Sequence, residues 1–265
     1  MTEKKRLEQL GYLIRCLQKE MPEYAGETLP QDSEKAFTLF RALCNVRMPR
    51  GSHQLPATFY SVEKEVLQSI TAEKGVVNGN ALVPSSLDNR LILWQGDITR
   101  LQVDAIVNAA NSGLLGCFRP LHNCIDNCIH TMAGVELREK CLEIMERQGH
   151  EEVTGTAKIT PGYNLPARYI LHTVGPIVTG RLTAREETLL ASCYRSCLDL
   201  AAATNVASIA FCCISTGVFM FPNKRAAEIA VKTVLDWLTK TKSQMKVVFT
   251  VFKEVDQQIY HSLLR

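Results

Sequence analysis

Short apolar segments rich in β-branched residues alternate with helical periods from about residue 88 onward, and this alternation constrains the fold more than any other feature. The apolar segments lie at 91–94, 105–107, 156–159, 169–174, 208–213 and 246–252. The helical periods lie at 126–147, 184–203, 224–240 and 255–264. Strands that alternate with helices predict an α/β layered domain, with helices on both faces of the sheet.

The first third of the chain has the pattern of amphipathic helices instead. Apolar residues recur at helical spacing from Leu7 to Leu17 on an otherwise charged segment, and the same pattern returns twice before residue 71. A chain of 265 residues is long enough for a core domain with an appended smaller one. We therefore predict a helical N-terminal extension at 1–87 and a sheet domain at 88–265.

The composition excludes several classes of partner. Hydrophobic residues make up 46% of the chain, the mean hydropathy is −0.02 and the formal net charge is +3. These values predict neither nucleic acid nor a membrane among its partners. The first residues mix acids with bases and have no apolar core, so we expect no signal peptide. The ten cysteines are then expected to be reduced thiols in a cytoplasmic protein.

Three polar loops follow predicted strands, where α/β proteins place their ligands. In G-D-I-T (96–99), the Asp97 carboxylate suits an exocyclic amine such as that of adenine. In N-A-A-N-S (108–112), the amides of Asn108 and Asn111 can hold ribose hydroxyls. In I-S-T-G-V-F (214–219), small residues before a helix can direct backbone N–H groups at phosphates. Each motif taken singly is more often an ordinary turn; their joint occurrence in this order points to a nucleotide ligand.

The segment C-F-R-P-L-H-N-C places two thiols and an imidazole, those of Cys117, His122 and Cys124, in one short loop. Two thiolates and one imidazole favour zinc, and three protein ligands with an open position describe a catalytic site. Two alternatives remain open. Cys128 as a fourth ligand would make the site structural, and all these cysteines can be ordinary buried thiols. His130, in the helix that follows, is more often a packing histidine than a ligand at such a position, and we leave its role unassigned.

Four motifs from residue 96 onward together resemble a macrodomain, the ADP-ribose-binding module. They are G-D-I-T, V-D-A-I-V-N-A-A-N-S, D-N-C-I-H and I-S-T-G-V-F-M-F-P, and the resemblance covers about two-thirds of the chain. It implies a three-layer α/β/α fold with a mixed, largely parallel central sheet. The implied ADP-ribose contacts are Asp97 and Ile98 at the adenine, Asn111 at the distal ribose, Asn108, Cys124, Ile125 and Asp126 nearby, and Ser215, Thr216, Gly217, Val218 and Phe219 at the diphosphate and distal ribose.

The chain departs from MacroD-type hydrolases at the loop that follows N-A-A-N-S. A glycine-rich loop is replaced there by C-F-R-P-L-H-N-C-I, Asn127 replaces a glycine, and Met220 stands where the family often has glycine. The replaced loop resembles the zinc-dependent macrodomains of Gram-positive bacteria, which also carry a helical N-terminal extension. In that subfamily the residues that match Cys117, His122 and Cys124 hold one zinc ion.

The resemblance implies a hydrolase that removes single ADP-ribose units from modified proteins, most plausibly from acidic side chains. Asp126 would position or deprotonate the attacking water, together with Asn111 at the ribose; Asp126 also suits an N-cap. Two other functions remain open, a non-catalytic reader of ADP-ribose and a hydrolase of a small ADP-ribose ester or phosphate. The subfamily further implies a sirtuin-type ADP-ribosyltransferase and a lipoyl-carrier protein as partners.

Overall fold

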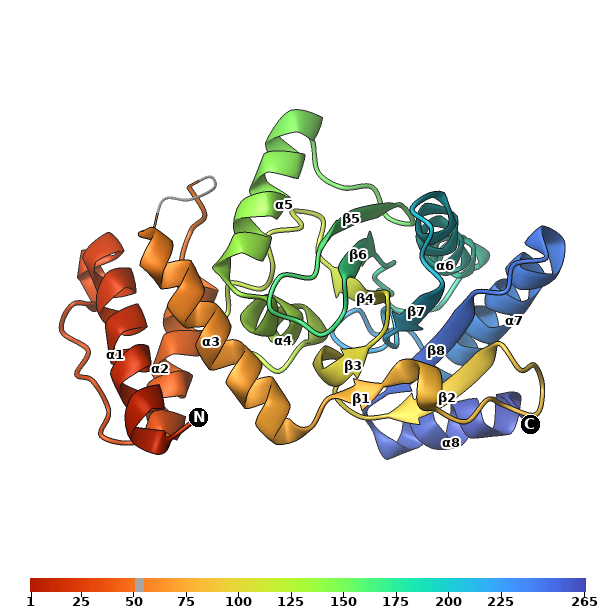
Figure 1. Cartoon of the computed structure of the whole chain (residues 1–265). Coiled ribbons are helices and arrows are strands. Elements are labelled where there is room, and N and C mark those ends of the chain that lie inside the picture. Colours follow the sequence, from red (N-terminus) through yellow and green to blue (C-terminus); the bar gives the residue numbers. More distant parts are fainter. Residues whose placement is uncertain (51–54) are drawn as a thin grey trace.

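A six-stranded sheet forms the centre of the molecule in the computed structural model, which describes residues 1–50 and 55–265 (Figure 1). The strands are β2 (Leu91–Gln95), β4 (Ala105–Ala110), β5 (Ala157–Pro161), β6 (Tyr169–Val174), β7 (Ser208–Phe211) and β8 (Lys246–Val251). They lie in the order β2-β8-β7-β4-β6-β5, and only the pair of β5 with β6 is antiparallel among these six strands. The strands β1 (Val77–Asn78) and β3 (Leu101–Gln102) form a separate parallel pair.

Helices connect the strands and cover the sheet. The helix α4 (Ile125–Ala133) packs against β4, and α5 (Val135–Gln148) packs against β5. The helices α6 (Ala184–Ala203), α7 (Asn223–Thr241) and α8 (Glu254–Leu263) pack in a row, each against the next. Because β4 and β8 are buried along nearly their whole length, they consist of apolar runs rather than alternating residues. The predicted layered α/β fold with a mixed, largely parallel sheet is confirmed.

The single helix expected at 126–147 is two helices, because the chain turns at Gly134. Gly134 has a φ of 96°, a conformation that residues with a Cβ rarely adopt. A Cβ at this position would also lie 2.6 Å from both Glu63 and Asn164. The apolar periodicity continues across the break, which is why the sequence pattern alone predicted one helix. The strand expected at 208–213 likewise ends earlier, at Phe211.

Three helices form the N-terminal part of the chain and lie at one end of the molecule (Figure 1). They are α1 (Glu3–Glu20), α2 (Ser33–Val46) and α3 (Ala57–Lys74), and α1 packs against both others. The Thr2 and Asp32 side chains cap α1 and α2 by accepting backbone N–H groups. Short 3-10 turns follow at η1 (Pro22–Tyr24) and η2 (Gly79–Ala81).

The predicted extension at 1–87 shares one hydrophobic core with the sheet. Leu10 of α1 and Phe40 of α2 belong to the same buried cluster as Ile106 of β4. Residues after α3 already pair with the sheet domain, since Val77 pairs with Leu101. The boundary at 87 stays a prediction, and 51–54 of the extension lie outside the described residues.

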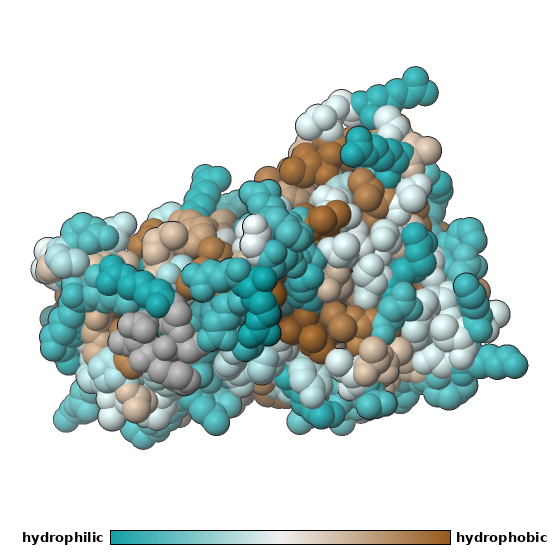
Figure 2. All heavy atoms as spheres, turned by 90° about the horizontal axis from the view of Figure 1, so that it is seen from above, coloured by the Kyte–Doolittle hydropathy of each residue, from teal (hydrophilic) through white to brown (hydrophobic). Residues whose placement is uncertain are grey.

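The face of the molecule drawn in Figure 2 carries hydrophilic side chains with apolar side chains between them. Among the helices of the described residues, none has the length and apolar character needed to cross a membrane.

Candidate active site

The loop between β4 and α4 brings the three predicted metal ligands together. The Sγ atom of Cys117 lies 3.6 Å from Nδ1 of His122, and ligand atoms of both residues and of Cys124 all lie within 4.8 Å of one another. All three side chains are half-buried. The cluster, as it stands among the described residues, does not include Cys128. Three converging soft ligands therefore fit a tetrahedral zinc ion with one position left for a non-protein ligand.

Cys124 has a second structural role at the start of α4. Its Sγ accepts the backbone N–H of Asn127 at 3.4 Å, so Cys124, and not Asp126, is the N-cap of this helix. The expected capping role of Asp126 is wrong, because Asp126 lies two residues after the N-cap, inside α4. Burial, with the neighbouring Cys117 thiol adding to it, raises the pKa of the Cys124 thiol to about 12. A bound divalent cation acts in the opposite direction, because a coordinating thiol loses its proton.

Asp126 is held by the two asparagines of N-A-A-N. The Asn108 amide donates to Oδ1 at 2.8 Å, and the Asn111 amide donates to Oδ2 at 3.3 Å. The residue is only 5% exposed. Burial raises the pKa of Asp126 to about 6, and the hydrogen bond from Asn108 opposes that rise. The arrangement fixes a buried carboxyl group two residues after Cys124, a predicted metal ligand.

Asn108 does not follow the strand as expected; it lies within β4 and is fully buried. Its side-chain amide nitrogen lies against Asp126 and His172. The predicted contact of Asn108 with a ribose hydroxyl stays a prediction. The Asn108 amide lies 3.2 Å from Nδ1 of His172, whose Nε2 lies 3.0 Å from the Thr160 hydroxyl. Burial lowers the pKa of His172 to about 4, so this imidazole is neutral at neutral pH.

The sequence interpretation missed His172 and left the role of His130 unassigned. His130 is buried with its Nε2 3.5 Å from Oδ1 of Asp126, so it borders the same carboxyl group. A histidine inside the apolar run Y-I-L-H-T-V is a signal for a buried polar contact, because an uncompensated imidazole in a sheet interior is unfavourable.

Asp97 and Ile98, the residues expected at adenine, stand at the turn after β2. Asp97 caps the 3-10 turn η3 (Ile98–Arg100): its Oδ1 accepts the Thr99 backbone N–H at 3.0 Å and the Thr99 hydroxyl at 2.7 Å. Ile98 is 2% exposed and packs into the core. The turn lies against α4, so the start of this motif is close to the helix that carries Asp126.

The loop Ser215–Phe219 follows β7 and precedes α7, which begins at Asn223 as expected. Ser215 has a φ of 64°, an unfavourable conformation for a residue with a side chain, and its buried Oγ has no hydrogen-bond partner among the described residues. Gly217 and Val218 are exposed. Met220 has a φ of 58°, which explains why a glycine suits this position in the family it resembles.

These segments meet at the end of the sheet where the parallel strands finish. β4, β6 and β7 are adjacent and parallel, so their carboxyl ends lie side by side. The loop that carries Cys117, His122 and Cys124 follows β4, Gly175 follows β6, and Ser215 follows β7. Gly175 and Ser215 are in contact: a Cβ at Gly175 would lie 2.0 Å from Ser215 Oγ. This end of the strands is the usual place for a ligand in an open α/β sheet.

Comparison with known proteins gives consistent matches. The Macro domain family model matches residues 107–230. A Treponema medium protein named protein-ADP-ribose hydrolase is 52% identical over the full length of both chains. A Staphylococcus aureus protein of the same name is 47% identical, covering 98% of this chain and 96% of its own. A Trypanosoma brucei macrodomain, solved in complex with ADP-ribose, is 32% identical with a TM-score of 0.66, over 81% of this chain and 93% of that one.

Proposed function

Because the chain belongs to the macro domain family, with relatives similar along its whole length, we propose that it is a zinc-dependent hydrolase that removes ADP-ribose from modified proteins. That it is an enzyme of this class follows from those relatives, which bear the name protein-ADP-ribose hydrolase. We propose acidic side chains as the site of the modification. A cytoplasmic location, a sirtuin-type ADP-ribosyltransferase and a lipoyl-carrier protein stay predictions.

The donor set supports zinc as the metal. Cys117, His122 and Cys124 would hold it, because two thiols and an imidazole already converge and hard cations such as Mg²⁺ prefer oxygen ligands. When bound, zinc would act as a Lewis acid at the distal-ribose end of the ligand and would lower the pKa of a water bound to it. Cys128 stays outside the cluster, which supports the catalytic rather than the structural type of site.

The chain's own residues supply the remaining chemistry. Asp126, held by the Asn108 and Asn111 amides, orients a water and accepts its proton as the water oxygen bonds to the anomeric carbon of the distal ribose. The bond from that carbon to the acidic side chain breaks, and the side-chain carboxylate leaves with the bonding electrons. Asn108 is a positioning residue, since it is fully buried and acts through Asp126. Asn111 is half-buried. It donates a hydrogen bond to this carboxylate and, in the proposed complex, also binds the distal ribose.

The nucleotide part of the ligand is held by the loops after β2, β4 and β7. The Asp97 carboxylate accepts a hydrogen bond from the adenine amine, beside Ile98. The backbone N–H groups from Ser215 to Phe219 donate hydrogen bonds to the diphosphate. The start of α4, at Cys124 and Ile125, adds N–H groups on the other side of the ligand. We propose that these loops together hold the ligand with the bond to be broken near Asp126.

One observation carries the proposal: a cluster of three zinc-type ligands ends two residues before a buried carboxyl group that both asparagines of N-A-A-N hold. The test incubates the zinc-loaded protein with a glutamate-linked ADP-ribosylated protein and measures free ADP-ribose by mass spectrometry. We expect release of one ADP-ribose per modified residue.

Two parallel measurements separate the alternatives. Calorimetry with free ADP-ribose reports binding, and a small ADP-ribose ester or phosphate reports hydrolysis without a protein substrate. Tight binding with no release from any substrate would identify a reader and overturn the proposal. Release from the small ester alone would identify the other class of hydrolase.

A further inference from the structure

Side chains of helix α2, in the N-terminal extension, bind backbone groups of the loop that carries Cys117, His122 and Cys124. The Arg41 guanidinium donates to the His122 carbonyl at 2.9 Å and, through Nε and Nη2, to Oδ1 of Asn127 at 3.2 and 2.9 Å. The Asn45 side chain accepts the Leu121 backbone N–H at 2.9 Å. These contacts join residues that are 76 to 86 positions apart in the sequence.

The partners of Arg41 extend this support over more of the loop. Asn127, whose side-chain oxygen Arg41 holds, donates its own amide to the Arg119 carbonyl at 3.2 Å. Its backbone N–H is the group that caps onto Cys124 Sγ. A single guanidinium on α2 is therefore connected to the loop on both sides of His122.

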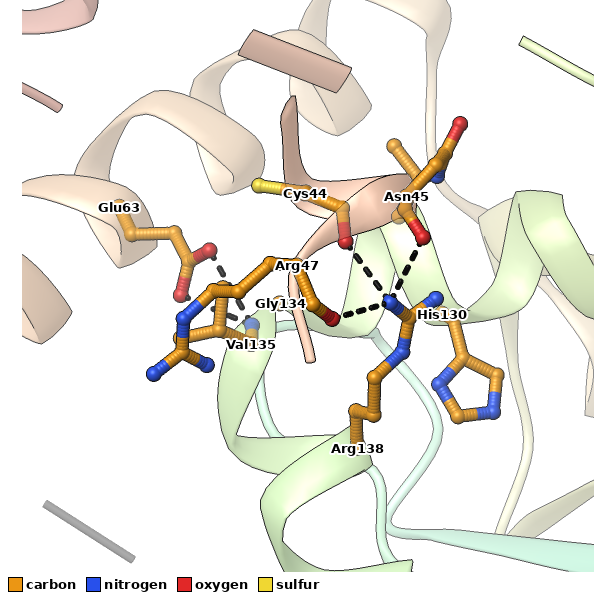
Figure 3. Close-up of a pocket in the computed structure, with 9 residues that line it drawn as sticks. Cys44, Asn45, Arg47, Glu63, His130, Gly134, Val135 and Arg138 are labelled. Atoms are coloured by element: carbon orange, nitrogen blue, oxygen red, sulfur yellow. Dashed lines mark hydrogen bonds between the residues drawn. The ribbon is translucent and has the colours of Figure 1, made fainter. Parts of the chain in front are cut away.

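Arg138 of α5 connects the end of α2 to the backbone of Cys117. Figure 3 shows its contacts at the end of α2. Its Nη1 donates to the carbonyls of Cys44, Asn45 and Arg47 at 2.8–2.9 Å, the groups that the end of α2 leaves without helical partners. Its Nη2 donates to the Cys117 carbonyl at 3.4 Å. Its guanidinium carbon also lies 4.4 Å from the ring centroid of Phe118.

The loop needs external support. It has no helix or strand between β4 and α4, and Leu121 has a φ of 56°, an unfavourable conformation for a leucine. The three candidate ligands lie within eight residues, so their convergence depends on the conformation of this backbone. Groups that orient metal ligands from outside the coordination sphere typically change metal affinity about 10- to 100-fold.

We infer that the N-terminal extension is part of the active site apparatus, with Arg41 and Asn45 as positioning residues that preorganise the loop carrying Cys117, His122 and Cys124. The inference deepens the proposed function and rests on it for the identity of the metal. The support of the loop by α2 rests instead on the hydrogen bonds of Arg41 and Asn45, which do not depend on the identity of the metal.

The first experiment measures backbone hydrogen exchange of peptides covering 117–124 in metal-free protein. We expect the backbone amides of 117–124 to exchange at least roughly fivefold faster in Asn45→Ala and in Arg41→Ala than in the wild-type protein. Each variant loses hydrogen bonds to the loop. Lys35→Ala is the matched control: it removes an exposed cation from the same helix, where Lys35 pairs with Asp32. Unchanged loop exchange in both variants would overturn the inference.

The second experiment measures Zn²⁺ affinity by competition with a chromophoric chelator. We expect a Kd about 10- to 100-fold weaker for Arg41→Ala and Asn45→Ala, and an intermediate value for Arg41→Lys, which keeps the charge but not the two-pronged geometry. Wild-type affinity in both alanine variants would contradict the inference. Failure of the wild-type protein to bind Zn²⁺ would instead overturn the metal of the proposed function, and hydrogen exchange would still decide the role of α2.

Discussion

Glu63 of α3 is a buried carboxyl group whose ionisation opposes folding. It is 1% exposed, and its two oxygens accept the Val135 backbone N–H at 3.2 and 3.3 Å, at the start of α5. Burial raises its pKa from 4.5 to about 8; the Val135 hydrogen bond and Arg47 oppose the rise, and the charges of Glu136 and Glu139 add to it.

The sign of the effect on stability follows from this direction. The unfolded chain loses the Glu63 proton near pH 4.5, whereas the folded protein keeps it until about pH 8. The unfolding free energy is therefore highest below pH 4.5 with respect to this group, and falls as pH rises towards 8. At about 1.4 kcal/mol per pKa unit, the loss is on the order of 4–5 kcal/mol.

The variant Glu63→Gln removes this loss but leaves an amide with one unmade hydrogen bond, at a cost of about 1 kcal/mol. At about pH 9 we expect the variant to be more stable than wild type by roughly 3 kcal/mol, or a Tm higher by about 6–12 °C. At about pH 5 the order reverses slightly.

Thermal unfolding followed by circular dichroism at both pH values measures the difference. Glu65→Gln, on the exposed side of the same helix and paired with Lys5, is the matched control and should show no comparable change between the two pH values. A Glu63→Gln variant destabilised equally at both pH values would refute the reasoning.

Three further predictions concern the ligand loops and the packing of the extension. Gly175→Ala places a Cβ 2.0 Å from Ser215 Oγ, so calorimetry should show ADP-ribose binding weakened about tenfold, and unchanged binding would contradict the contact. Asp126→Asn keeps the shape of the side chain but removes a carboxylate oxygen, so ADP-ribose release should slow about 10²–10⁴-fold while binding changes less. Arg47→Ala leaves the buried Glu139 without its guanidinium partner and should lower the unfolding free energy in urea by about 3–5 kcal/mol; a loss below about 1 kcal/mol would count against a buried ion pair.

Two of these variants have matched controls in the chain. A Cβ at Gly26 meets nothing within 4 Å, so Gly26→Ala should leave ADP-ribose binding unchanged. Arg225 makes comparable pairs with Glu187 and Glu228 at the surface, and Arg225→Ala should cost less than about 1 kcal/mol.

The order of strands and helices was predictable from the sequence because hydrophobic periodicity reports burial directly. The break at Gly134 was not, since the apolar face continues through it and only the φ of 96° reveals the turn. Aspartate is a common cap, so the sequence also allowed Asp126 as the N-cap of α4. The structure uses Cys124 instead, a weaker sulfur acceptor that propensity does not favour.

The candidate site was predictable as far as its members are close in sequence. Cys117, His122 and Cys124 lie in one loop, so spacing alone predicted that they meet. The contacts of Asp126 with Asn108 and of His122 with Arg41 depend on how strands and helices pack. Local sequence patterns do not indicate such contacts between distant residues. For this reason the proposed role of the N-terminal helices could not be predicted from the sequence.

Dependence of ADP-ribose release on zinc tests the central claim most directly. The protein is stripped of metal with a chelator, and release from a glutamate-linked ADP-ribosylated protein is measured before and after Zn²⁺ is added, for wild type and for Cys117→Ala. We predict that Zn²⁺ restores release in the wild-type protein and not in Cys117→Ala, while both keep the same far-ultraviolet circular dichroism spectrum. Full release by the metal-stripped wild-type protein would contradict the account.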